Sequence, residues 1–312
     1  MQSRSKGNAQ GIDVSHWQGM IDWKKVATSG ISFVFIKATQ NSMDKRFLDN
    51  VKGAKAAGLL VGAYHYIDDS VITVDKARMA ARIFYNAILV AGGQDVFDLP
   101  PVLDYESNKN NLSKSMITAI AKAFLEEIQS LTGVKPLIYT YPSFIGNFTG
   151  LNNYPLWIAR YNASTAPDNA SGWTSWDFWQ YSDGSAGGTL PSGTRKVDGI
   201  NGTVDLNEYD GTVAELKTHY NKKKIEHVKD VELMPESNRD IYVGSIWAER
   251  DWAEAKANGY FDGSRPGAAI TREESAIVLN KLRRNFLKLI AGNTARISEL
   301  KQQLQVIEKD EK

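Results

Sequence analysis

Short apolar runs alternate with longer amphipathic segments through the first two-thirds of the chain. Apolar residues in the short runs are consecutive or alternate with polar ones, which is typical of strands, whereas the longer segments repeat them every three or four residues, as helices do. The pattern predicts strands at Gly11–Trp17, Phe33–Ala38, Leu60–Tyr66, Pro101–Tyr105, Pro136–Tyr141, Leu156–Tyr161, Asp177–Tyr181 and Val204–Tyr209. It predicts helices between the early strands, at Asp44–Ala57, Val74–Val90 and Lys114–Thr132.

This alternation predicts parallel strands joined by right-handed helical crossovers. Eight strands in about 200 residues are typical of a (β/α) barrel. The loops between the last three strands are rich in Gly, Ser, Asn and Pro and leave no room for full helices. We therefore expect an α/β fold, a TIM-like barrel that is poor in helices on one side. A doubly wound open sheet is the alternative, but no Gly-x-Gly-x-x-Gly follows the first strand.

The character of the chain changes near Tyr220, where aromatic residues become sparse and charged ones frequent. The change predicts a barrel domain at 10–220, a linker at 221–240 and a small all-α domain at 241–312. Residues 1–9, ahead of the first strand, are expected to form a flexible N-terminus.

The C-terminal domain has two helical patterns, Ser245–Asn258 and Thr271–Leu289, and the second begins with a capping box of Thr271 and Glu274. From Leu282 to Ile307 apolar residues recur every three or four positions. That spacing predicts either a short coiled coil or an amphipathic helix packed on its own domain.

Composition narrows the possible functions. The 312 residues include 37 basic and 36 acidic ones, a net charge of +1, so charge gives no reason to expect a nucleic acid or a membrane surface as partner. Cysteine is absent and histidines number four, which excludes disulfides and thiolate catalysis and argues against structural zinc. No apolar run predicts a membrane span, and residues 1–10 lack the apolar region of a signal peptide. We expect no metal and no other cofactor.

Two acids two positions apart, Asp104 and Glu106, come at the end of an apolar strand. Side chains two apart on a strand share a face. Glycoside hydrolysis uses such a pair, with one carboxyl group protonated to donate to the leaving oxygen and one ionised. The alternative is a solvated surface pair. In a barrel the strand ends converge, which adds Asp13 from the first strand and Asp205 from the last. Repulsion among four acids raises the pKa of at least one, as a general acid requires.

Aromatic side chains at the strand ends predict the walls of a groove around these acids. The candidates for substrate contacts are Tyr64, Tyr66, Tyr139, Tyr141, Trp157 and Trp179, with Tyr161 and Tyr181 at comparable positions. Because side chains alternate along a strand, we expect about half of these rings to line the groove and the rest to lie in the core. Such a groove favours a neutral carbohydrate chain and would repel a phosphate. His65 is expected to be structural, and Lys37 to pair with an acid.

Eight ordered segments resemble the family 25 glycoside hydrolases, the Chalaropsis-type lysozymes or N-acetylmuramidases. They are Gly11–Gly19, Phe33–Thr39, Gly62–Tyr66, Leu103–Glu106, Pro136–Tyr141, Leu156–Tyr161, Trp179–Tyr181 and Val204–Asn207. The resemblance covers roughly 10–215 and implies a barrel with five helices and three final helix-poor strands. It also implies cleavage, with retention, of the β-1,4 bond from N-acetylmuramic acid to N-acetylglucosamine in peptidoglycan glycan strands.

The resemblance also implies roles for the four acids. Glu106 would be the general acid. Asp104 would stabilise the developing positive charge, either as nucleophile or by orienting the acetamido group of the substrate, and the sequence leaves both mechanisms open. Asp13 and Asp205 would hold the sugar or tune the pKa of the central pair. The alternatives are a non-hydrolytic peptidoglycan-binding protein on the same barrel, and a chitinase, whose Asp-x-x-Asp-x-Asp-x-Glu run is missing.

Residues Trp247–Glu274 resemble a single S-layer-homology repeat, with a tryptophan-bearing helix, a Gly turn and a Thr-Arg-Glu-Glu helix start. Such repeats usually come in threes and bind secondary cell-wall polymers. We expect 241–290 either to anchor the chain to the wall or to be a helical appendage without a ligand. A homodimer or higher oligomer through the C-terminal helix would supply several copies. The combination resembles a bacteriophage endolysin of a Gram-positive host, kept in the host cytoplasm until a holin releases it to the wall.

Overall fold

The computed structural model describes the chain except for residues 162–163, 221–248, 262–263, 265–271 and 311–312. The chain divides into two compact units, Met1–Val231 and Glu232–Lys312. The division falls inside the predicted linker at 221–240, which itself lies outside the described residues.

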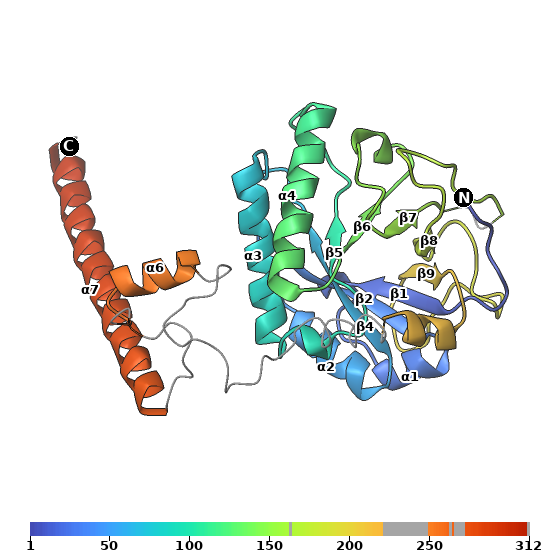
Figure 1. Ribbon diagram of the computed structural model, residues 1–312, viewed down its shortest axis with the longest axis horizontal. Helices are drawn as coiled ribbons and strands as arrows, with labels where there is room; N and C mark the ends of the chain where they lie inside the picture. The colour runs from blue at the N-terminus through green and yellow to red at the C-terminus, as the bar shows by residue number, and fades with distance from the viewer. Residues whose placement is uncertain (162–163, 221–248, 262–263, 265–271, 311–312) are drawn as a thin grey trace. The chain divides into compact units, whose positions relative to one another are not determined.

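The first unit is a closed barrel (Figure 1). Its strands are β1 (Gln10–Val14), β2 (Phe33–Gln40), β4 (Leu60–Tyr66), β5 (Val102–Asp104), β6 (Leu137–Thr140), β7 (Leu156–Ala159), β8 (Phe178–Ser182) and β9 (Asp205–Tyr209). A short strand β3 (Ser42–Met43) adds to β2 at the rim. The sheet runs in the order β1-β9-β8-β7-β6-β5-β4-β2, and pairing of β1 with β2 closes it. The predicted eight-stranded α/β barrel is confirmed.

The last strand departs from the expected parallel arrangement, because β9 runs antiparallel to both β8 and β1. A parallel strand needs a crossover that carries the chain back to the opposite end of the sheet. The loop at 183–204 instead connects β8 to β9 at one rim and contains no helix. The chain therefore re-enters the barrel from the rim where the other strands end.

The helices of the first unit lie between the early strands. They are α1 (Trp23–Thr28), α2 (Phe47–Ala56), α3 (Val74–Val90) and α4 (Lys114–Thr132), with 3-10 turns η1 (His16–Gln18), η2 (Gln94–Val96) and η3 (Ile145–Asn147); residues 213–220 are also helical. Side chains of Thr73 and Ser113 cap α3 and α4 by accepting backbone N–H bonds. Among the described residues no helix lies between β7 and β9, which confirms the helix-poor side.

Alternation along the strands separates an inner from an outer core. Phe33 and Phe35 of β2 point into the barrel, whereas Val34 and Ile36 pack outward against the helices. The ring of Phe35 stacks on the Trp157 indole with centroids 4.5 Å apart. This aromatic plug fills the barrel below its rim, so any opening must lie at the strand ends.

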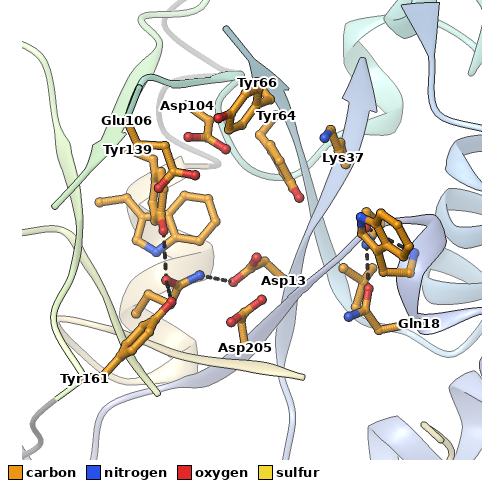
Figure 2. A pocket seen from close by; sticks show the side chains of 15 residues that line it. Asp13, Gln18, Lys37, Tyr64, Tyr66, Asp104, Glu106, Tyr139, Tyr161 and Asp205 are labelled. Atoms are coloured by element: carbon orange, nitrogen blue, oxygen red, sulfur yellow. Dashed lines mark hydrogen bonds between the residues drawn. The ribbon is translucent and has the colours of Figure 1, made fainter. Parts of the chain in front are cut away.

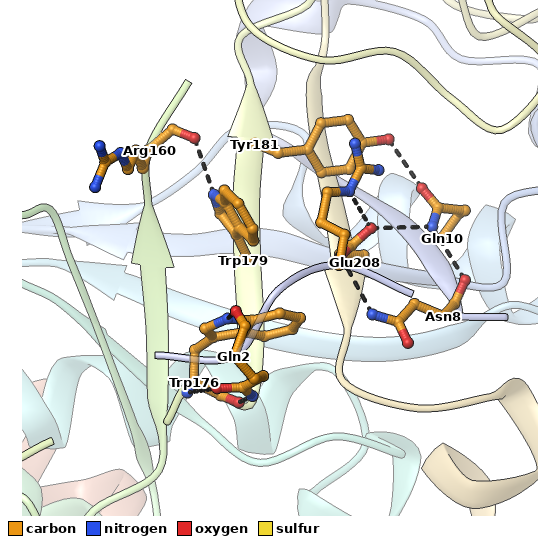
Figure 3. Close-up of polar contacts among 9 residues, drawn as sticks. Gln2, Asn8, Gln10, Arg160, Trp176, Trp179, Tyr181 and Glu208 are labelled. Carbon is orange, nitrogen blue, oxygen red and sulfur yellow. Dashed lines mark hydrogen bonds and ion pairs between the residues drawn. The ribbon is translucent and has the colours of Figure 1, made fainter. Parts of the chain in front are cut away.

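Residues 1–9, which we expected to be flexible, lie against the outer face of β8 and β9 (Figure 3). The Trp176 Nε1–H donates to the Gln2 carbonyl over 2.9 Å. Arg4 Nε lies 2.6 Å from Glu208 Oε2, and its guanidinium stacks over Tyr181 at 3.8 Å. The segment covers strands that no helix covers in the described structure.

The second unit contains α6 (Glu249–Ala257) and α7 (Arg272–Asp310). Trp252 packs against Phe261 with ring centroids 5.0 Å apart, and Lys281 Nζ donates to the Gly259 carbonyl. The predicted second helix, Thr271–Leu289, continues 21 residues further, to Asp310. Its predicted capping residue, Thr271, lies outside the described residues. In the part of the chain that the structure describes, no helix is long and apolar enough to cross a membrane.

Candidate active site

A pocket of about 280 Å³ opens at the rim where β1, β4, β5 and β6 end. The four predicted acids, Asp13, Asp104, Glu106 and Asp205, all line it. Figure 2 shows their carboxyl groups pointing into one shared space. The structure thus brings together acids that are up to 192 positions apart in the sequence.

Strand register explains how these acids meet. Asp13 and Asp205 are direct cross-strand partners on β1 and β9. Asp205 is the first residue of β9. Because β9 runs antiparallel to β1, the start of β9 lies at the rim where β1 ends. Asp104 is the last residue of β5, and Glu106 follows two positions beyond it.

Asp13 is held by two amide side chains. Its Oδ2 accepts from Asn207 Nδ2 over 2.7 Å and from Gln180 Nε2 over 2.8 Å. The Asn207 amide oxygen accepts in turn from the Trp157 indole N–H, and the Gln180 amide oxygen accepts from the Tyr139 hydroxyl. The amide orientations are thus fixed by their other partners, and both present N–H groups to Asp13.

Burial makes it costly to ionise all four acids. It raises the pKa of Asp13 to about 6, although the two amide donors act in the opposite direction. Burial and the neighbouring charge of Asp13 raise the pKa of Asp205 to about 8. At neutral pH the pocket therefore retains at least one proton.

The central pair is shifted in the same direction. Burial and the charge of Glu106 raise the pKa of Asp104 well above its usual range. Burial and the charge of Asp13 raise the pKa of Glu106, and Lys37 lowers it. Asp104 Oδ1 is buried without a hydrogen-bond partner in the described structure. Burial therefore favours the protonated form of both carboxyl groups, and Asp104 has an oxygen left for a substrate group.

Lys37 and His65 have different surroundings. Lys37 Nζ donates to Gln40 Oε1 over 2.6 Å and lies 4.9 Å from the ring centre of Tyr66; the expected acid partner is replaced by an amide. His65 is buried outside the pocket with its Nδ1 2.6 Å from Thr39 Oγ1, and burial lowers its pKa to about 3. His65 is therefore a neutral structural residue.

Four of the six predicted aromatic contacts line the pocket: Tyr64, Tyr66, Tyr139 and Trp157. Trp179 does not, because alternation on β8 points Phe178 and Gln180 inward and Trp179 outward, where its N–H donates to the Arg160 carbonyl. Tyr141 lies beyond the end of β6 and donates its hydroxyl to the backbone carbonyl of Glu106 over 3.1 Å. It supports the loop that carries the acid.

Tyr161, which the sequence placed at a comparable position, also lines the pocket, whereas Tyr181 does not. Other pocket residues were not among the predicted contacts: Val14, Ser15, Trp17, Gln18, Lys37 and Gln180. Strand alternation, which points Trp179 outward, also points Gln180 inward. The position of Gln180 in the pocket could therefore have been predicted from the sequence. Trp17 and Gln18 follow β1 in a turn, where strand alternation gives no guidance. The described residues contain no group of three or more side chains arranged to hold a metal ion.

Comparisons with known proteins point to one family. The profile of the glycosyl hydrolases family 25 matches residues 12–188. Lysozyme M1 of Streptomyces globisporus is 36% identical over 220 residues, which are 66% of this chain and 69% of that protein. The N,O-diacetylmuramidase of Chalaropsis sp is 32% identical over 213 residues, 63% of this chain and 95% of that protein.

Solved structures give the same result. A bacterial lysozyme from Streptomyces coelicolor has a TM-score of 0.57 and 33% sequence identity, and the alignment covers 70% of this chain and 100% of that one. The family match at 12–188 includes Asp13, Asp104 and Glu106 and ends before Asp205.

Proposed function

This chain belongs to family 25 of the glycosyl hydrolases and is a muramidase of the lysozyme type, and we propose that it cleaves the β-1,4 bond from N-acetylmuramic acid to N-acetylglucosamine with retention. The observation that carries the proposal is the position of Asp104 and Glu106 at the end of β5, in one pocket with Asp13 and Asp205. Rings of Tyr64 and Trp157 also line that pocket, and aromatic rings beside acids suit a sugar.

In the proposed reaction Glu106 donates its proton to the glycosidic oxygen as the bond from that oxygen to the sugar carbon breaks. Asp104 stabilises the positive charge that develops on the sugar. It does so as the nucleophile or by accepting the N–H of the substrate's acetamido group, whose oxygen then attacks. Water completes the reaction: one of its protons goes to Glu106, and its oxygen bonds to the sugar carbon as the bond from that carbon to Asp104 or to the acetamido oxygen breaks. The two displacements together retain the configuration.

Asp13, whose pKa is raised to about 6, keeps the pocket negative at neutral pH, and neither Asp13 nor Asp205 takes part in bond exchange. The charge of Asp13 raises the pKa of Glu106, which favours the protonated form that the first step needs. Asp205 has its pKa raised to about 8, so at neutral pH it is a hydrogen-bond donor for a sugar hydroxyl or carbonyl.

Mass spectrometry of fragments released from purified Gram-positive cell walls tests the bond assignment. The proposal predicts muropeptides with new reducing-end N-acetylmuramic acid from the wild-type protein and none from Glu106→Gln. New reducing-end N-acetylglucosamine would mean that the neighbouring bond is cut. Proton NMR of the first product tests retention, since a β anomer must precede the α anomer.

We further propose that the C-terminal unit anchors the chain to a secondary wall polymer, as in an endolysin that acts on the wall after holin-mediated release. The support is the likeness of its sequence to an S-layer-homology repeat, together with the ring contact of Trp252 and Phe261 that joins α6 to its turn. Sedimentation of full-length Glu106→Gln with purified walls tests this proposal. Adding Trp252→Ala should release the protein from the walls; unchanged retention would assign wall binding to the barrel.

A further inference from the structure

The pocket is too small for a glycan strand. Its volume of about 280 Å³ lies just below the roughly 300–1,000 Å³ of sites that enclose drug-sized ligands. It therefore encloses only a short part of a strand, and the remaining sugars must lie on the rim. Figure 2 shows Gln18 and Tyr161 on opposite sides of the four carboxyl groups.

Trp17, next to Gln18, lines the pocket and is 81% exposed. The other tryptophans of the barrel unit, Trp23, Trp157, Trp173, Trp176 and Trp179, are buried. Water thus reaches most of the Trp17 indole, which lies at the edge of the pocket.

The backbone of Trp17 is fixed on both sides. It is the middle residue of η1, whose N-cap Ser15 accepts the Trp17 N–H while the Gln18 side chain accepts the Ser15 N–H over 2.9 Å. Gly19, with φ of 64°, closes the turn by donating to the His16 carbonyl.

The indole is also supported from the side. The His16 ring lies 4.6 Å from it, centroid to centroid. A hydrogen bond of 2.6 Å joins His16 Nδ1 to Asp44 Oδ2, and the Asp44 side chain is only 3% exposed. The Arg46 N–H donates to the other Asp44 oxygen. A buried carboxylate therefore orients the imidazole on which the exposed ring rests.

A single exposed apolar side chain is ordinary on a protein surface. Met20, three residues on, is such a case: it is 79% exposed and does not line the pocket. Trp17 differs because it is exposed, held in place and adjacent to the acids. A flat ring held in water at the mouth of a sugar site offers a surface for the apolar face of a pyranose.

We propose that Trp17 is a glycan-binding platform outside the cleavage site, which stacks on an N-acetylated sugar of the bound strand on the β1 side of the pocket. His16 and Asp44 act as positioning residues for the indole. The inference rests on the proposed function, since it assigns a further binding position to the same substrate.

Steady-state kinetics on peptide-free glycan strands test the platform, with a tetrasaccharide and a long strand as substrates. Trp17→Ala should raise KM for the long strand about tenfold and change kcat less than about twofold, because the lost contact is made equally in ground and transition states. Trp17→Phe should recover most of the affinity. Met20→Ala, the matched exposed control, should leave both constants unchanged.

Two outcomes overturn the platform: equal KM values for Trp17→Ala and Met20→Ala, or a fall in kcat at unchanged KM. An unchanged melting temperature of Trp17→Ala shows that the variant is folded. Failure of the proposed function looks different, because the wild-type protein would then release no reducing-end N-acetylmuramic acid, whatever residue stands at Trp17.

Discussion

At the residue scale, chemistry depends on how the protons are distributed among Asp13, Asp104, Glu106 and Asp205. Burial raises the pKa of every one of them. Their neighbours differ: Asp13 has two amide donors, whereas Asp104 has an unpartnered oxygen. When neighbouring carboxyl groups have different surroundings, their pKa values differ, and one can act as an acid while another acts as a base.

Asp13→Asn should move the alkaline limb of the kcat/KM profile to lower pH. The charge of Asp13 raises the pKa of Glu106, so its removal lowers that pKa and the acid loses its proton at a lower pH. Normalised pH–rate profiles on soluble glycan strands measure the shift.

Lys37→Met is the control of opposite sign. The Lys37 charge lowers the pKa of Glu106, so its loss should move the same limb to higher pH. Shifts of both variants in one direction would show that at least one of the two residues does not act through the pKa of Glu106.

At the element scale, strand alternation explains both what could be predicted and what could not. Apolar periodicity predicted the bounds of α3 and α4 and the presence, though not the bounds, of the eight strands. The outward position of Trp179 follows from alternation on β8, once that strand is known to place Phe178 in the barrel. The turn that carries Trp17 and the antiparallel direction of β9 have no periodic signal, because loops and tertiary pairing set them.

The N-terminal segment is an element that composition did not reveal. The polar composition of residues 1–9 suggested that they make no contacts with the barrel. In the structure Arg4, Asn8 and Gln10 each contact Glu208, whose side chain is 1% exposed. A buried carboxylate needs partners, and these come from a strand and the segment just before it. The terminus is ordered by a buried acid, Glu208, that lies 204 positions away from Arg4 in the sequence. Local composition carries no information about so distant a partner.

Arg4→Ala should lower the free energy of unfolding by about 2 kcal/mol near pH 8, below the roughly 3–5 kcal/mol of a fully stripped pair because two amide donors remain. Burial already raises the pKa of Glu208, and Arg4 opposes that shift. Without Arg4 the folded-state pKa rises further above the unfolded value, so stability is kept below the unfolded pKa and lost as pH rises. Urea unfolding at pH 4 and pH 8 measures the difference.

Glu208→Gln in the Arg4→Ala background should remove the pH dependence that Arg4→Ala adds to that of the wild type, since the carboxylate that lost its partner is gone. An added pH dependence that persists in the double variant would assign the effect of Arg4→Ala to other groups.

At the scale of the whole molecule, the two units differ in how well the sequence predicted them. The barrel unit carries eight family-like segments whose spacing is fixed by a closed sheet. The second unit contains two described helices, α6 and α7. Apolar residues spaced every three or four positions form a seam along α7, and five of them are exposed: Leu282, Phe286, Ile290, Ile297 and Leu300. Sequence alone could not decide between a coiled coil and a helix packed on its own domain, because both use the same period.

The exposed seam favours self-association of α7, so the full-length protein should sediment as a dimer or higher oligomer. Ile290→Asp should shift the species toward monomer, because it places a charge in the middle of the seam. Lys288→Asp, two positions away on the opposite face, is the matched control and should keep the oligomer. Analytical ultracentrifugation over a range of concentrations measures this; a wild-type monomer throughout would contradict it.

The central claim is that Glu106 supplies the proton and Asp104 stabilises the sugar cation. The most direct test compares kcat/KM for a natural glycan strand and for a dinitrophenyl glycoside, whose leaving group needs no proton. Glu106→Gln should lose about 10²–10⁴-fold on the natural strand and less than about tenfold on the activated substrate, whereas Asp104→Asn should lose activity on both. Equal losses of Glu106→Gln on the two substrates would contradict the assignment of the acid.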